Sequence, residues 1–167
     1  SIGRADAKDI EILGQEAFDF AMKRLNPNED DSCACLTNAG YTTFKGQSTQ
    51  GLYDIISNNK KLSFAKGNLL VVHDRNDAPL WLAMVSKPST DKLMMVYVTI
   101  TDSGINYSDL LDVHIGKGTS FTPFKAAMGE KAFAIVTLAN GWADNIPENL
   151  LRGALFHDHL CCGVSRG

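Results

Sequence analysis

Two histidines and two cysteines lie within six residues near the C-terminus of this sequence. The stretch is Phe156-His157-Asp158-His159-Leu160-Cys161-Cys162-Gly163, in a chain that has only four histidines and four cysteines in total. On a helix, His157 and Cys161 are four residues apart and share one face, about 6 Å from each other. An imidazole nitrogen and a thiolate sulfur both suit zinc, so this pair predicts half of a zinc-type metal site.

The same stretch contains a second pair, His159 and Cys162, three residues apart on a different helical face. One helix can therefore hardly present all four side chains to one ion, unless the turn unwinds at the following glycine and three of them converge. Two alternatives stay open. The histidines and thiols could simply pack in a buried helix, or Cys161 could be a nucleophile that His157 activates. No Asp or Asn is obviously placed to orient such a base, although Asp158 is adjacent.

Other candidate residues give weaker indications. Cys33 and Cys35 are too close in sequence for a relaxed disulfide with each other, which leaves buried thiols or a long-range disulfide to the C-terminal pair. His73 and His114 occur singly near the ends of predicted strands, a placement more typical of structural histidines than of metal ligands. The segment Gly116–Ser120 lacks the spacing of a phosphate-binding loop, so a solvated turn is predicted there.

The elements that must position these residues follow from apolar spacing. Helices are predicted over Asp6–Leu25, Ser48–Asn59 and Thr122–Lys131, and from Pro147 onward. Strands are predicted over Cys33–Thr37, Asn68–His73, Leu80–Val85, Leu93–Thr101 and Ala132–Leu138, with a loop over Asn140–Asn145. Short turns between the three middle strands predict an antiparallel meander. The expected fold is therefore α+β, an antiparallel sheet with helices packed mainly on one face.

Composition narrows the function classes. The chain has 167 residues, a length suited to one domain, and is 44% hydrophobic and 21% charged. Its formal net charge is −3 and no Lys/Arg cluster stands out, so a nucleic-acid partner is not expected. The apolar runs are too short for a membrane span. Because the sequence starts at Ser1 rather than at Met, a processed, exported form is one expectation, and the localisation is otherwise unknown.

Two stretches resemble a known family. Phe156–Gly163 is similar to the F-H-G-H-L-C-P-G signature of proteins related to the E-type subunit of formylmethanofuran dehydrogenase. Leu62-Ser63-Phe64-Ala65-Lys66-Gly67-Asn68-Leu69 is similar to that family's C-T-F-G-K-G-N-L segment. The resemblance implies a metal-binding protein, archaeal and associated with methanogenesis. It does not imply catalysis, because the family is named after an operon neighbour.

The sequence also departs from the family pattern. In the family the His/Cys signature comes first, whereas here it comes last, so we expect a tandem arrangement: residues 1–146 form a degenerate first copy and residues 147–167 begin a second. The family pattern implies further ligands at positions that hold Gly51 and Leu62 here, and neither side chain can bind a metal. Asp158 and Cys162 replace the Gly and Pro of the signature.

The resemblance and the residues together predict a metal-binding accessory protein, with zinc or a similar transition metal at His157, Cys161, His159 and Cys162. The missing ligands would come from a second copy of the chain, from a partner protein, or from Cys33 and Cys35. The alternatives are a structural or assembly protein whose Cys-rich C-terminal helix mediates subunit contacts, and a small-molecule or redox enzyme that uses Cys161. Whether the protein is an enzyme stays open.

Overall fold

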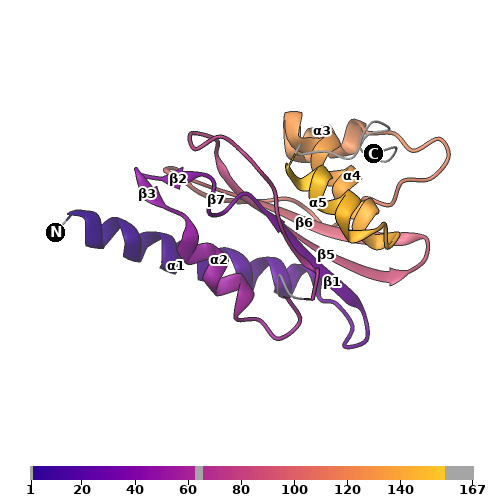
Figure 1. Ribbon diagram of the computed structural model, residues 1–167, viewed down its shortest axis with the longest axis horizontal. Helices are drawn as coiled ribbons and strands as arrows, with labels where there is room; N and C mark the ends of the chain where they lie inside the picture. The colour runs from indigo at the N-terminus through magenta and orange to yellow at the C-terminus, as the bar shows by residue number, and fades with distance from the viewer. Residues whose placement is uncertain (1, 63–65, 157–167) are drawn as a thin grey trace.

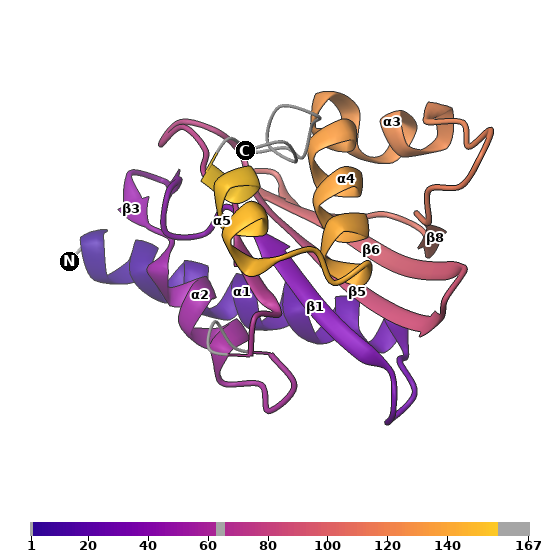
Figure 2. The ribbon, with the colours of Figure 1, turned by 45° about the vertical axis from the view of Figure 1, so that its right-hand side comes forward.

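One mixed β-sheet separates two layers of helices in the computed structural model, which describes residues 2–62 and 66–156 (Figure 1). The strand order is β4-β1-β5-β6-β7, and β8 pairs with β6. All neighbours are antiparallel except β1 and β4, which run parallel. The predicted α+β class is confirmed. The prediction that helices pack mainly on one face is wrong, because helices cover both faces of the sheet (Figure 2).

The strands lie close to their predicted positions but are connected differently. They are β1 (Ser32–Thr37), β4 (Leu69–Val71), β5 (Leu80–Ser89), β6 (Lys92–Thr101), β7 (Gly104–Tyr107) and β8 (Leu111–Asp112), and β2 (Thr43–Phe44) pairs with β3 (Gln47–Ser48) in a separate small hairpin. The predicted hairpin between β5 and β6 is confirmed. The predicted meander is wrong at β4, because β1 lies between β4 and β5.

The first helical layer consists of α1 (Ile2–Leu25) and α2 (Gln50–Ser57). One face of α1 is buried against the sheet and α2. Its described residues are Ile10, Ala17, Phe18, Ala21 and Leu25. Gly14 allows α2 to approach closely, because a Cβ atom at this position would lie 2.9 Å from Leu52 Cδ1. Helix α1 ends at Leu25. The next residue, Asn26, has a φ of 44°, and its N–H donates to the Met22 carbonyl at 2.9 Å.

The second layer consists of α3 (Thr122–Met128), a short 3₁₀ turn (Gly129–Lys131), α4 (Ala132–Ala143) and α5 (Glu148–Phe156). The strand predicted over Ala132–Leu138 and the loop predicted from Asn140 are both wrong, because this segment is α4. Helix α4 is buried at eight of its 12 positions. Its sequence is apolar apart from Thr137 and Asn140 and lacks the one-sided period that marks a surface helix. A short apolar run with β-branched residues cannot be distinguished from a buried strand by periodicity alone.

The sheet supplies side chains to a separate core on each face. In β5, Trp81, Ala83 and Val85 belong to the core under α3, α4 and α5, and the intervening residues belong to the core under α1 and α2. Because both faces of this strand are covered, Leu80–Ser86 is buried at every position. The weak alternation of β5 in the sequence follows directly from this double burial.

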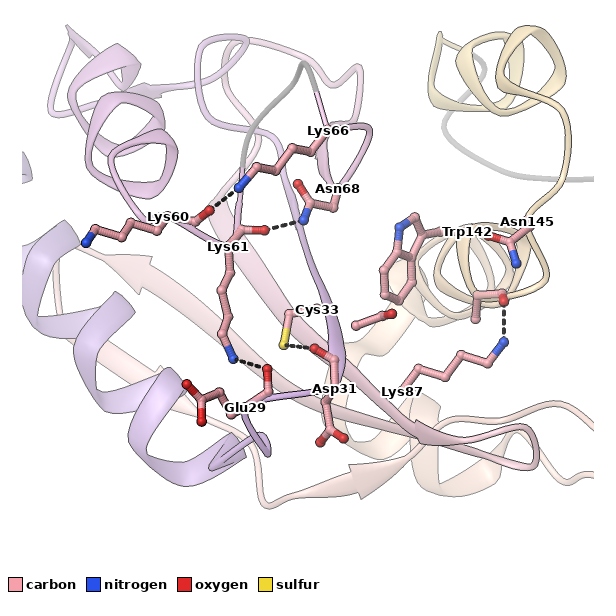
Figure 3. A pocket seen from close by; sticks show the side chains of 12 residues that line it. Glu29, Asp31, Cys33, Lys60, Lys61, Lys66, Asn68, Lys87, Trp142 and Asn145 are labelled. Atoms are coloured by element: carbon pink, nitrogen blue, oxygen red, sulfur yellow. Dashed lines mark hydrogen bonds between the residues drawn. The ribbon is translucent and has the colours of Figure 1, made fainter.

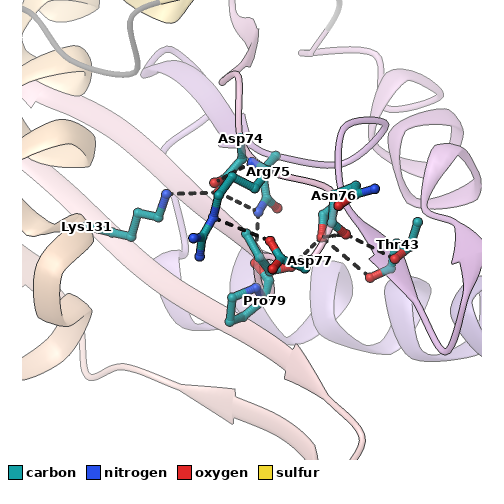
Figure 4. A network of polar contacts seen from close by, with 10 residues as sticks. Thr43, Asp74, Arg75, Asn76, Asp77, Pro79 and Lys131 are labelled. Atoms are coloured by element: carbon teal, nitrogen blue, oxygen red, sulfur yellow. Dashed lines mark hydrogen bonds and ion pairs between the residues drawn. The ribbon is translucent and has the colours of Figure 1, made fainter.

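A network of polar contacts connects the loop between β4 and β5 with the end of β1 (Figure 4). The side-chain amide of Asn38 donates to the Pro79 carbonyl at 2.8 Å and to Asp74 Oδ2 at 3.0 Å, and its oxygen accepts from the Trp81 N–H at 3.0 Å. Lys131 Nζ pairs with the same Asp74 oxygen at 2.9 Å. Burial alone would raise the pKa of Asp74, but the hydrogen bonds from Lys131, Asn38 and a backbone N–H outweigh it and lower that pKa.

Candidate functional site

The four residues predicted to bind a metal, His157, His159, Cys161 and Cys162, lie outside the described residues. Helix α5 is described as far as Phe156, the residue directly before His157. The shared helical face of His157 and Cys161, and the binding of an ion there, therefore stay predictions.

The described part of the last helix packs on its own domain. Helix α5 begins directly after Pro147, as predicted. Leu151, Ala154 and Leu155 are buried in the core that α4 shares with the sheet. The Leu155 carbonyl accepts a hydrogen bond from the N–H of His73 at 3.1 Å, just beyond the end of β4. The chain therefore approaches the His/Cys stretch from a fixed point beside β4, and these three apolar residues need no partner protein to cover them.

The first stretch that resembles the family and the helix that leads into the second border one pocket. The pocket, with a volume of about 500 Å³, is lined on one side by Lys66, Gly67 and Leu69 and on the other by Leu151 and Leu155 of α5. Its remaining lining residues are Leu70, Trp142, Asn145, Ile146, Pro147 and Arg152. Two segments far apart in the sequence thus meet at one place in the fold.

A second pocket of about 420 Å³ lies next to the first and shares Lys66, Trp142 and Asn145 with it. Four lysines line it, Lys60, Lys61, Lys66 and Lys87, together with Glu29, Asp31, Ser32, Cys33, Asn68 and Ala143. Figure 3 shows the indole of Trp142 projecting from α4 into this pocket, opposite the segment that carries Lys66 and Asn68. We call the two adjoining pockets together the lysine groove.

The positions of the two N-terminal cysteines distinguish their possible roles. Cys35 is fully buried in the core under α1 and α2, and burial strongly raises the pKa of its thiol. Cys33 lines the lysine groove, and its thiol donates to the Asp31 carbonyl at 3.6 Å. Burial raises the pKa of Cys33 and outweighs the opposing effect of Lys61. Burial therefore disfavours the thiolate form of both residues. Cys33 borders the lysine groove, whereas Cys35 is enclosed in the core.

The described residues do not form a metal site by themselves. Among residues 2–62 and 66–156, no group of three or more His, Cys, Asp or Glu side chains is close enough to hold an ion. Leu62 is fully buried in the core, and the Gly51 backbone packs against Glu11 of α1. The ring of His73 contacts that of Tyr41 edge to face, with 5.0 Å between centroids. A metal site would therefore depend on ligands beyond Phe156.

The lysine groove was not predicted from the sequence. Its residues come from the loop before β1 and the start of β1, from the segment between α2 and β4, and from β4, β5, α4 and α5 with the loop before it. Only the tertiary fold brings these segments together. The only local indication is the occurrence of Lys60, Lys61 and Lys66 within seven residues. In the described part of the chain, no helix has both the length and the apolar character required to cross a membrane.

Comparisons with protein-family models, with curated proteins and with solved structures return no match for this chain. The family resemblance of the two stretches therefore stays a prediction.

Proposed function

We propose that this chain is a metal-binding accessory protein related to the E-type subunit of formylmethanofuran dehydrogenase. His157 and Cys161 would be the principal ligands, and His159 and Cys162 are the further candidates in the same stretch. The mixed nitrogen and sulfur donors favour zinc or a similar transition metal over magnesium or calcium. A bound ion of this kind would act as a structural centre or as a Lewis acid.

The observation that supports this proposal is that the first family-like stretch and the helix leading into the second line one pocket. Lys66 and Gly67 belong to the first stretch, and Leu155 of α5 lies two residues before His157. The fold therefore places the first stretch beside the helix that precedes the predicted ligands.

Completing the ligand set requires donors beyond the His157–Cys162 stretch or from another molecule. Of the two N-terminal cysteines, Cys33 is the better candidate, because it borders the lysine groove while Cys35 is enclosed in the core. A second copy of the chain or a partner protein is the other source. The competing function, an assembly protein that uses the terminal helix for subunit contacts, draws less support, because Leu151, Ala154 and Leu155 pack within their own domain.

Elemental analysis of the purified chain tests the proposal. We expect stoichiometric zinc in the purified wild type. Zinc content should fall sharply in Cys161→Ser, because a serine hydroxyl is a much poorer zinc ligand than a thiolate. Cys35→Ala is the matched control, and it should retain the metal because Cys35 lies in the core. Light scattering with and without zinc then shows whether a second copy completes the site. A wild type without metal, or a Cys161→Ser variant with full occupancy, would contradict the proposal.

A further inference from the structure

The lysine groove has the size of a small-molecule site. Its two compartments, of about 420 and 500 Å³, share Lys66, Trp142 and Asn145 as common walls. Ligand sites in proteins commonly have volumes of about 300–1,000 Å³ and combine apolar walls with a few polar groups. Each compartment is therefore large enough to hold part of a small organic ligand.

The first compartment attracts negative charge. Four lysines line it against two acidic residues, Glu29 and Asp31, whereas the formal net charge of the whole chain is −3. Figure 3 shows both carboxylates directed away from Trp142, while Lys60 also extends outward from the pocket. The ammonium groups of Lys61 and Lys66 lie across the pocket from the indole, and that of Lys87 lies beside the end of α4 (Figure 3). A concave surface with an excess of one sign of charge concentrates counter-ions of the opposite sign.

Hydrogen bonds to the backbone hold these lysines at the groove. Lys61 Nζ donates to the carbonyls of Asn28 and Glu29 at 3.4 and 3.2 Å, and Lys66 Nζ donates to the Lys60 carbonyl. Lys87 Nζ donates to the carbonyl of Ala143, the last residue of α4, at 2.5 Å. A lysine ammonium carries three N–H donors, so one that already binds a carbonyl can still donate to a ligand.

The second compartment is more apolar than the first, although Lys66, Asn145 and Arg152 also line it. Leu69, Leu70, Ile146, Leu151 and Leu155 line it, and Trp142 stands at the boundary with the first compartment. We propose that the lysine groove binds a small amphiphilic anion, with its carboxylate or phosphate group among the lysines and its apolar body alongside α5. This function goes beyond the proposed metal centre and does not depend on it, because none of the lysine contacts requires an ion.

Calorimetric titration with matched eight-carbon probes tests the proposal. Octanoate and octyl phosphate carry both features, 1-octanol has the apolar chain without the charge, and inorganic phosphate has the charge without the chain. We expect the two amphiphilic anions to bind at least about tenfold more tightly than either control, since charge-assisted hydrogen bonds and apolar burial both contribute. The tighter of the two anions identifies the head group. If 1-octanol binds as tightly as octanoate, or if neither anion binds, the proposal is wrong.

Variants locate the site. Lys66→Glu and Lys61→Gln should each weaken octanoate binding, and the charge reversal at Lys66 should do so by about tenfold. Lys117→Glu is the control: this lysine is exposed and outside the groove, so octanoate binding should be unchanged. Octanoate binding should also change the tryptophan fluorescence. Trp142→Phe should abolish this change, because the other tryptophan, Trp81, is buried in the core. Equal weakening in the Lys117 variant, or a fluorescence response that persists in Trp142→Phe, would place the ligand elsewhere.

The same titration in EDTA separates this proposal from the metal centre. Binding that is unaffected by EDTA supports a lysine site, even if the chain proves to contain no zinc. Binding that disappears with the metal assigns the anion to a metal ion instead and overturns the inference.

Discussion

Replacing Asp74 by Asn should destabilise the protein by about 2 kcal/mol. The Asp74 side chain is only 6% exposed, and its carboxylate accepts hydrogen bonds from Lys131, from Asn38 and from the N–H of Arg75. A hydrogen bond to a charged group contributes about 1.5–3 kcal/mol, and removing one partner leaves the other unpaired. The Lys131 side chain is 33% exposed, so water can partly replace the lost carboxylate, which favours the lower half of this range.

The assay is equilibrium urea unfolding followed by circular dichroism, in which the midpoint should fall while the slope stays the same. In a chain of this size, about 2 kcal/mol corresponds to a melting temperature lower by roughly 4–8 °C. Asp77→Asn is the matched control in the same loop. Asp77 pairs with Arg75 at 3.4 Å, but both side chains are more than 70% exposed, so this change should cost less than about 0.5 kcal/mol.

The pH dependence provides a second, independent test. The pKa of Asp74 in the folded protein lies below its ordinary value of 3.8, so the unfolded chain takes up this proton first as the pH falls. The stabilisation is therefore present at neutral pH and declines below about pH 4. The stability difference between wild type and Asp74→Asn should shrink over the same range. Equal losses for Asp74→Asn and Asp77→Asn, or a difference that stays constant down to about pH 2, would refute this account of the network.

Two further predictions concern packing and thiol exposure. Gly14→Val should destabilise the protein by about 1–3 kcal/mol in urea unfolding, because the new side chain would collide with the buried Leu52. An unchanged unfolding midpoint would show that α1 and α2 can separate without cost. In alkylation mapped by mass spectrometry, Cys33 should react slowly in the native protein and Cys35 only after unfolding. The reason is that burial raises both thiol pKa values, while Cys33 borders the lysine groove and Cys35 is enclosed in the core. Comparable native rates for the two thiols would contradict these placements.

Elements with a clear local pattern were predictable from the sequence. The apolar spacing of α1, which buries one face, and the short apolar segment of β1, which is buried on both faces, correspond to elements in the structure within a few residues. Helix α4 was mistaken for a strand because it is buried nearly all round, which removes the polar face that would have revealed its period. The position of β1 between β4 and β5 could not be predicted, because a short turn after β4 is compatible with either connection.

The two candidate sites also differ in how far they could be predicted from the sequence. The predicted metal ligands are local in sequence, so residue types and spacing were sufficient to propose them. The lysine groove is non-local: Cys33, Lys66, Lys87 and Trp142 belong to four different segments, and none carries an indication of the others. Periodicity describes neighbours along an element, whereas a groove depends on which elements meet in space.

The position of β1 between β4 and β5 has a consequence for the order in which the chain can fold. Strands β5 and β6 are neighbours along the chain, so their hairpin closes only a short loop. Strand β1 can pair with its antiparallel partner β5 only when that strand is present, and β5 lies far along the chain, beyond α2 and β4. Contacts between residues distant in sequence form slowly. During synthesis the apolar segment Cys33–Leu36 therefore emerges well before the strand that will cover its edge, and any fragment that ends before β5 lacks the partner needed to build the sheet.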